Sequence, residues 1–293
     1  MLRPAKWKLE FMAAGSQVYA APFDEAAGHY DQVFTNSRIG RAQRLFVWEE
    51  LAKTFHAGDQ ILEIGCGTGV DACYLAERGV RVLGCDSSPK MIAVAVRKLQ
   101  DSPRSELVEV RVLAAEHISS LRGQKLFDGA FSNFGALNCV ADLKSQAEGL
   151  AVLMRPGATA LLCWMGPFCL WETLWYLLQG KPGKAFRRRH REGIVTRVDG
   201  GVPVTVYYPS VRMLARTFAP HFSIKSIKGV GVTVPPSYLE PLARRFPRLL
   251  NAAVVADGIL GRCPGIRLLA DHILIRLERQ PDSLGRTTVT KNE

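Results

Sequence analysis

The nine residues ILEIGCGTG, at positions 61–69, constrain the fold of this chain more than any other stretch. An apolar run of strand character leads directly into Gly65, Gly67 and Gly69, and a helical pattern starts at Val70. Glycines at such a turn let a ligand come close to the backbone, because a Cβ atom would collide with it. The stretch therefore predicts a nucleotide-type binding turn in an α/β fold.

The spacing of these glycines separates the turn from two common phosphate sites. A dinucleotide fingerprint would need its third glycine at position 70, where this chain has Val70, and no G-x-x-x-x-G-K-[ST] motif occurs. Glu63 precedes the glycines, where a carboxylate repels a pyrophosphate and attracts a cation. Asp86 ends the next predicted strand, where a carboxylate can accept hydrogen bonds from both hydroxyls of a ribose. The pattern predicts a positively charged nucleoside as ligand.

The region from about residue 40 to 165 alternates helical and strand signals, which is typical of a doubly wound parallel sheet. Strands are predicted at 60–65, 80–86, 108–114, 127–134 and 158–165, and again at 222–230 and 272–279. The predicted fold class is α/β: a Rossmann-like doubly wound sheet, parallel with an antiparallel last strand, with a helical cap insertion.

The same alternation of helical and strand signals predicts the domain boundaries of the chain. Residues 1–45 are expected to form an N-terminal lid segment and 46–165 the ligand-binding core. Residues 166–205 form the cap insertion, because apolar-aromatic and basic residues replace the regular pattern there. The core resumes over 206–279 with a second helical insertion, and 280–293 is a loose polar tail.

The glycine motif with Asp86, together with FDGAFSNFGALN at 127–138, resembles the class I S-adenosylmethionine-dependent methyltransferases of the small-molecule group. The resemblance covers about residues 55–165 and implies S-adenosylmethionine as cofactor, with no metal. Gly65, Cys66, Gly67 and Gly69 would wrap its methionine part, and Glu63 would lie near its ammonium group.

The resemblance also implies contacts to the nucleoside part of the cofactor. Asp86 would hold the ribose, and Tyr30 of the segment 26–34 could contact the cofactor. The expected contacts around the adenine and at the substrate mouth are Ser87, Met91, Ala115, Glu116, Asn133 and Phe134. The family often has Asp where this chain has Ala114, which weakens the expected adenine contacts there.

Methyl transfer is an in-line displacement, so it needs mainly a dry pocket that aligns the nucleophile with the methyl group. A base can assist by removing a proton. His29 and His272 are the candidate catalytic residues, and each has a structural alternative: helix packing for His29, and a backbone cap with Asp271 for His272. The fourth strand carries SNFG instead of an N-P-P-Y-like motif, which disfavours amide methylation.

The family resemblance and the cap favour a small, largely apolar metabolite methylated on oxygen. Three alternatives remain open: carbon methylation of a quinone or lipid-like substrate at the membrane surface, RNA methylation, and a cofactor-binding protein without catalysis. Trp171, Leu174, Trp175 and Leu178 recur at helical spacing after the fifth strand. Such a stripe indicates either core packing or a roof over the substrate.

The net charge of +11 permits several anionic partners. The basic run at 181–193 is either a solvated loop or a peripheral membrane contact, while nucleic acid is disfavoured because no RNA-binding module is present. Seven cysteines without a C-x-x-C pair favour a reducing compartment. No signal peptide or transmembrane helix is predicted, so a cytoplasmic location is expected. The pattern leaves the oligomeric state open.

Overall fold

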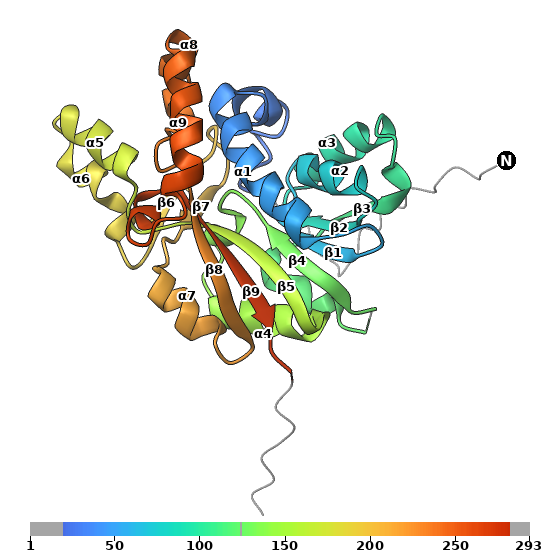
Figure 1. Cartoon of the computed structure of the whole chain (residues 1–293). Helices are drawn as coiled ribbons and strands as arrows, with labels where there is room; N and C mark the ends of the chain where they lie inside the picture. Colours follow the sequence, from blue (N-terminus) through green and yellow to red (C-terminus); the bar gives the residue numbers. More distant parts are fainter. Residues whose placement is uncertain (1–19, 124, 282–293) are drawn as a thin grey trace, which may run out of the picture.

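A computed structural model describes residues 20–123 and 125–281 and is built around one seven-stranded sheet (Figure 1). The strand order is β3-β2-β1-β4-β5-β9-β8. Five strands run parallel, and β9 runs antiparallel to both of its neighbours. The predicted fold class is confirmed. The strands are β1 Gln60–Ile64, β2 Arg81–Asp86, β3 Val108–Val112, β4 Phe127–Ser132, β5 Met154–Met165, β8 Phe222–Val230 and β9 His272–Arg279.

Helices cover both faces of the sheet (Figure 1). Alternate strand residues point to opposite faces, so Ile61 packs on one side and Leu62 on the other. The first side is covered by α1 (Arg38–Thr54), α2 (Val70–Ala76) and α3 (Pro89–Gln100). The second side is covered by α4 (Leu143–Leu153) and α7 (Val211–Phe218).

The start of α3 shows how local sequence fixes an element near the site. Ser88 is the N-cap, its Oγ accepts a hydrogen bond from the amide of Met91 at 3.0 Å, and Pro89 follows in the first turn. A serine cap satisfies a free amide, and proline has no amide to leave unsatisfied there. The helix therefore begins at Pro89, three residues after Asp86.

Two additions rise from the sheet edge where the parallel strands end (Figure 1). The first follows β5 and contains α5 (Leu170–Leu178), α6 (Pro182–Ala185) and the antiparallel pair β6 (Ile194–Arg197) and β7 (Pro203–Val206). The second follows β8 and contains α8 (Glu240–Arg245) and α9 (Pro247–Leu260). The cap thus adds a small sheet to the predicted helices. Within the described residues, no helix is both long and apolar enough to span a bilayer.

Candidate functional site

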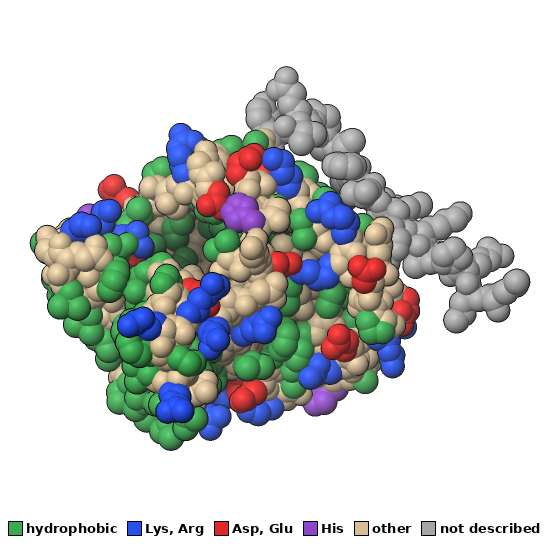
Figure 2. Space-filling model, turned by 90° about the horizontal axis from the view of Figure 1, so that it is seen from above, with side chains coloured by type: hydrophobic (Ala, Val, Ile, Leu, Met, Phe, Trp, Pro, Cys, Tyr) green, Lys and Arg blue, Asp and Glu red, His purple; other side chains and the backbone are tan. Residues whose placement is uncertain are grey.

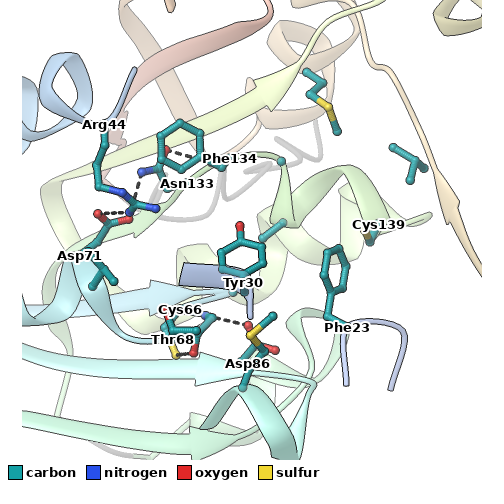
Figure 3. Close-up of a pocket in the computed structure, with 18 residues that line it drawn as sticks. Phe23, Tyr30, Arg44, Cys66, Thr68, Asp71, Asp86, Asn133, Phe134 and Cys139 are labelled. Atoms are coloured by element: carbon teal, nitrogen blue, oxygen red, sulfur yellow. Dashed lines mark hydrogen bonds and ion pairs between the residues drawn. The ribbon is translucent and has the colours of Figure 1, made fainter. Parts of the chain in front are cut away.

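A cavity lies at the carboxyl ends of β1, β2, β4 and β5, and residues 20–37 contribute Phe23 and Tyr30 to its wall (Figure 3). Its walls are mostly apolar, with carboxylates and one cation at defined places. The lining includes eight residues predicted for the cofactor site: Tyr30, Gly65, Cys66, Gly67, Asp86, Met91, Asn133 and Phe134. The other lining residues are Phe23, Arg44, Thr68, Val70, Asp71, Gly135, Ala136, Cys139, Met165 and Val206.

The glycine loop after β1 forms the floor of the cavity. Gly65, Gly67 and Gly69 have φ values of 71°, 52° and 75°, which favour glycine. A Cβ on Gly65 would lie 2.2 Å from the Cβ of Ala136, so the protein itself requires glycine there. A Cβ on Gly67 would meet no described atom within 4 Å. Gly67 therefore leaves open the space that a ligand in close contact with the backbone would fill.

Asp86 connects the second strand to this loop. Its Oδ2 accepts the amide of Gly67 and its Oδ1 accepts the amide of Ser88, both at 2.8 Å. Burial raises the pKa of the Asp86 carboxyl, and the two amides oppose that rise. An ionised carboxylate offers about four acceptor sites. Two therefore stay available for the hydroxyls of a ribose in the cavity.

Glu63 lies in β1 behind the loop and does not line the cavity. Its side chain is buried, and its Oε2 has no hydrogen-bond partner among the described residues. Burial, reinforced by the negative charge of Asp71, raises the pKa of Glu63 well above its usual value. An unsatisfied buried acid is costly unless a cation or donor reaches it. Contact between Glu63 and the ammonium group of S-adenosylmethionine stays a prediction.

A buried hydrogen-bond network around Asp71, which was not predicted from the sequence, holds the part of the cavity wall formed by Arg44 and Asn133. Asp71 in α2 accepts hydrogen bonds from the guanidinium of Arg44, from Nε1 of Trp48 at 2.7 Å and from Nδ2 of Asn133 at 3.0 Å. The guanidinium carbon of Arg44 also lies 4.8 Å from the ring centroid of Phe134. These contacts fix α1, α2 and the end of β4 against one another.

Phe134 takes a backbone conformation that is rare for a residue with a side chain. Its φ is 43°, and its amide donates to Oδ1 of Asn133 at 2.9 Å. Such local strain persists only where surrounding contacts enforce it, and it is concentrated at functional sites. The predicted pair Asn133 and Phe134 therefore forms a rigid part of the cavity wall.

The lid is tied to the core on both sides of Tyr30. Asp24 accepts a hydrogen bond from Oγ of Ser88, and Asp31 pairs with Nζ of Lys98 at 2.7 Å. Oδ1 of Asp31 also accepts from Thr68 of the glycine loop at 2.7 Å. Burial raises the pKa of Tyr30 to about 12, so its hydroxyl stays protonated at neutral pH. Figure 3 shows the Tyr30 ring between the Asp86 and Phe134 sides of the cavity.

The expected adenine contacts Ser87, Ala115 and Glu116 do not line the cavity. Ser87 and Glu116 are exposed, and Ala115 begins a short helical turn, Ala115–Leu121. Burial raises the pKa of Cys139, which lines the cavity, to about 11, and the charges of Glu116 and Asp86 add to the rise. This places Glu116 close enough to affect that wall. The roles of these residues in binding adenine stay predictions.

The two histidines predicted as bases do not line the cavity. Nε2 of His29 lies 3.0 Å from Oδ2 of Asp199 in the β6–β7 turn, and both side chains are about half exposed. His272 is buried at the start of β9, with Nδ1 3.4 Å from Oδ2 of Asp271. Its ring packs edge-on against Phe134 at 5.5 Å. His272 thus lies behind Phe134, outside the cavity, and His29 contacts the cap through Asp199. Their catalytic roles stay predictions.

Asn138 fixes the cap to the core, and the sequence did not predict this role. Its Oδ1 accepts the amide of Met165, its Nδ2 donates to the carbonyls of Met165 and Tyr207, and its own carbonyl accepts the amide of Tyr207. One buried amide side chain thus joins the end of β5 to the end of the cap, next to the cavity residue Val206.

The basic run is not simply a solvated loop. Arg188 is 6% exposed, and its guanidinium donates to Glu172 at 2.9 and 3.1 Å and to Oδ1 of Asp271 at 2.7 Å. Arg187 also donates to Glu172, at 2.8 Å. Arg188 therefore ties α5 to the start of β9, while Arg189 stays exposed.

Three of the four residues in the apolar stripe after β5 have neither of the two expected roles. Leu174, Trp175 and Leu178 of α5 are 48%, 39% and 85% exposed, and none of the stripe lines the cavity. Only Trp171 at the base of the helix packs inward, against the cluster that holds Ile39 and Leu239. Both expectations, core packing and a roof over this cavity, are wrong for the exposed three.

Comparison with known proteins agrees with the geometry. Residues 62–160 match the family described as a methyltransferase domain. The matched segment is a class I S-adenosylmethionine-dependent methyltransferase domain. The match begins in β1 and ends in β5, so it includes the glycine loop, Asp86, Asn133 and Phe134. S-adenosylmethionine is thereby confirmed as the cofactor.

Two named relatives match the chain over different lengths. Demethylmenaquinone methyltransferase of Clavibacter sepedonicus is 32% identical over 144 residues, which is 49% of this chain and 56% of that protein. Malonyl-[acyl-carrier protein] O-methyltransferase of Serratia marcescens is 28% identical over 229 residues, 74% of this chain and 79% of that protein. The chain thus spans only about half the length of the first of these relatives.

A solved structure of the same fold extends the likeness beyond the cofactor half. The complex of DhpI with SAH has a TM-score of 0.55 and 16% identity, and it covers 88% of this chain and 94% of that protein. At this identity the likeness concerns the fold alone.

Proposed function

We propose that this methyltransferase transfers a methyl group from S-adenosylmethionine to a small, largely apolar acceptor, and that the accepting atom is an oxygen. The cofactor supplies the electrophilic methyl group when bound. The acceptor enters between Tyr30 and Phe134, where apolar side chains such as Met165 and Val206 exclude water. Alignment in a dry pocket is the main requirement of this reaction.

We choose oxygen as the accepting atom because both carboxylates in the cavity wall already accept hydrogen bonds from the protein. Asp71 is held by three donors and Asp86 by two amides. Among the described lining residues there is no histidine, lysine or glutamate. A nucleophile that ionises without a strong base suits such a wall, and acidic carboxyl or phenol oxygens meet this condition.

The relatives support the same choice in part. The likeness to the O-methyltransferase of Serratia marcescens reaches over 74% of the chain, whereas the likeness to the menaquinone enzyme covers 49%. Methylation of a ring carbon in a quinone precursor is the second candidate function, favoured by the apolar walls of the cavity. Transfer to RNA and cofactor binding without transfer are the remaining alternatives.

The test uses S-adenosylmethionine with a ¹³C-labelled methyl group and three kinds of acceptor. The acceptors are apolar carboxylic acids and phenols, a hydroxynaphthalene that can react at carbon, and a mixture of transfer RNAs. The carbon chemical shift of the product separates a methyl ether or ester from a ring methyl group. Label on oxygen supports the proposal, label on carbon or RNA contradicts it, and cofactor binding without any labelled product indicates a binding protein.

A further inference from the structure

Two of the added helices bury their acids and expose apolar side chains. In α5 the only charged residue is Glu172, which is 2% exposed, whereas Leu178 is 85% exposed. In α9 the only acid is Asp257, also 2% exposed, which accepts the amides of Gly231 and Thr233. A surface helix of a globular protein normally has the opposite pattern. The outward faces of α5 and α9 therefore expose apolar side chains that no described residue covers.

The added helices α5, α8 and α9 all carry exposed apolar side chains, and a groove connects the base of α5 to the other two. Trp171 of α5 donates from Nε1 to the carbonyl of Thr233 at 3.1 Å, and a groove lined by Trp171, Leu242, Phe246 and Leu249 joins it to α8 and α9. We call these exposed side chains the apolar rim. Its members are each at least 39% exposed: Leu174, Trp175, Leu177 and Leu178 of α5, and Leu242, Phe246, Leu249, Val255 and Ile259 of the α8–α9 segment.

Charge around the apolar rim is predominantly basic at the surface, with Glu192 of the run 181–193 as an exposed acid beside it. Every acid in residues 170–191 and 240–262 is buried, namely Glu172, Glu240 and Asp257. The exposed charged residues of the same two segments are all basic: Lys181, Lys184, Arg189, Arg191, Arg244, Arg245, Arg248 and Arg262. An apolar surface with such a border complements an anionic lipid headgroup layer.

The apolar rim lies on the same side of the molecule as the cavity. In Figure 1, α5, α8 and α9 rise beyond the sheet edge at which the parallel strands end. Figure 2 looks down on this side and shows hydrophobic and basic side chains next to a hollow. The buried bridge from Arg188 to Glu172 and Asp271 holds α5 in this position.

We propose that the apolar rim docks on an anionic lipid bilayer, with α5 and α9 lying in the interface and the basic residues against the headgroups. Docking of this kind needs two signals, burial of apolar side chains and attraction of cations to anionic lipid, and the rim carries both. It would bring the cavity next to molecules dissolved in the membrane. The proposal adds a binding surface to the proposed function and does not depend on it.

The test measures binding of the full chain to vesicles by co-sedimentation. We expect binding to vesicles that contain phosphatidylglycerol, weaker binding as salt rises, and weak binding to phosphatidylcholine alone. Tryptophan fluorescence should shift to the blue on binding, and Trp175→Phe should reduce that shift. The double change Leu249→Gln with Ile259→Gln should lower partitioning at least about tenfold, and Arg245→Gln or Arg248→Gln about fivefold each.

Matched controls come from α7, which lies elsewhere on the molecule (Figure 1). Met213→Gln replaces a 51% exposed apolar residue, and Arg212→Gln with Arg216→Gln removes two exposed cations. These variants should bind vesicles like the original chain. Circular dichroism and cofactor binding confirm that each variant folds.

Three results would overturn the proposal. The first is absence of binding to anionic vesicles, or equal losses in the α7 controls. The second is a dimer in light scattering that the Leu249→Gln and Ile259→Gln changes convert to a monomer, with no vesicle binding, since the rim would then be a contact between copies. The third is binding to RNA without binding to vesicles. Each of these leaves methyl transfer in the cavity unaffected and separately measurable.

Discussion

The amide of Gly67 donates a hydrogen bond to Oδ2 of Asp86 at 2.8 Å, so the glycine loop and the end of the second strand form one unit. Replacing Asp86 removes the acceptor of this amide and the acceptor for the ribose. Because hydrogen bonds to charged groups contribute about 1.5–3 kcal/mol, Asp86→Ala should weaken binding of S-adenosylmethionine about 10- to 100-fold. Calorimetric titration measures this. Glu109→Ala, at an exposed carboxylate of β3, is the control and should bind normally.

Removing the Arg188 side chain should destabilise the whole protein. Arg188→Ala would leave the buried carboxylates of Glu172 and Asp271 without their shared cation, which costs about 3 kcal/mol or more. The neighbouring Arg189→Ala, at an exposed position, should change the free energy of unfolding by less than about 0.5 kcal/mol. Denaturant unfolding of both variants is the measurement. Equal stabilities would show that the buried bridge contributes nothing.

The histidines offer a direct comparison between catalysis and positioning. A general base typically contributes about 100-fold or more to the rate. Because neither ring lines the cavity, His29→Ala and His272→Asn should each lower kcat less than about tenfold, with KM changing for His29 through its contact to Asp199. Steady-state kinetics across pH decides this. A loss above about 100-fold, together with a shifted pH profile, would instead establish that histidine as the base.

Binding of the cofactor should release a proton from Glu63. Burial raises the pKa of this carboxyl well above its ordinary value of 4.5, which favours the protonated form in the free protein. An ammonium group beside it favours the ionised form, so affinity should rise with pH, by up to about tenfold per unit, from 4.5 to the raised pKa and then level off. Calorimetry in buffers of different ionisation enthalpy reports the proton, and Glu63→Gln should abolish its release.

Local patterns predicted most of this fold. The glycine turn and the antiparallel last strand each depend on neighbouring residues or on strand periodicity, which the sequence displays directly. Two sets of contacts join residues far apart in the chain: the bridge between Arg44 and Asp71, and the hydrogen bonds of Asn138. Hydrophobic periodicity does not predict such contacts. The exposed stripe of α5 was misjudged because apolar spacing shows that a helix has an apolar face, but not what covers it.

The central claim is that the cavity above the glycine loop binds S-adenosylmethionine against the backbone of Gly67. Titration of S-adenosylmethionine into two alanine variants tests it most directly. Gly67→Ala and Gly58→Ala both place a side chain at positive φ, 52° and 95°, with no described atom within 4 Å, but only Gly67 lines the cavity. The account predicts that Gly58→Ala binds the cofactor like the original chain, that Gly67→Ala loses binding at least about 100-fold while staying folded, and that NAD binds to neither. Equal affinity of the two variants for S-adenosylmethionine would contradict it.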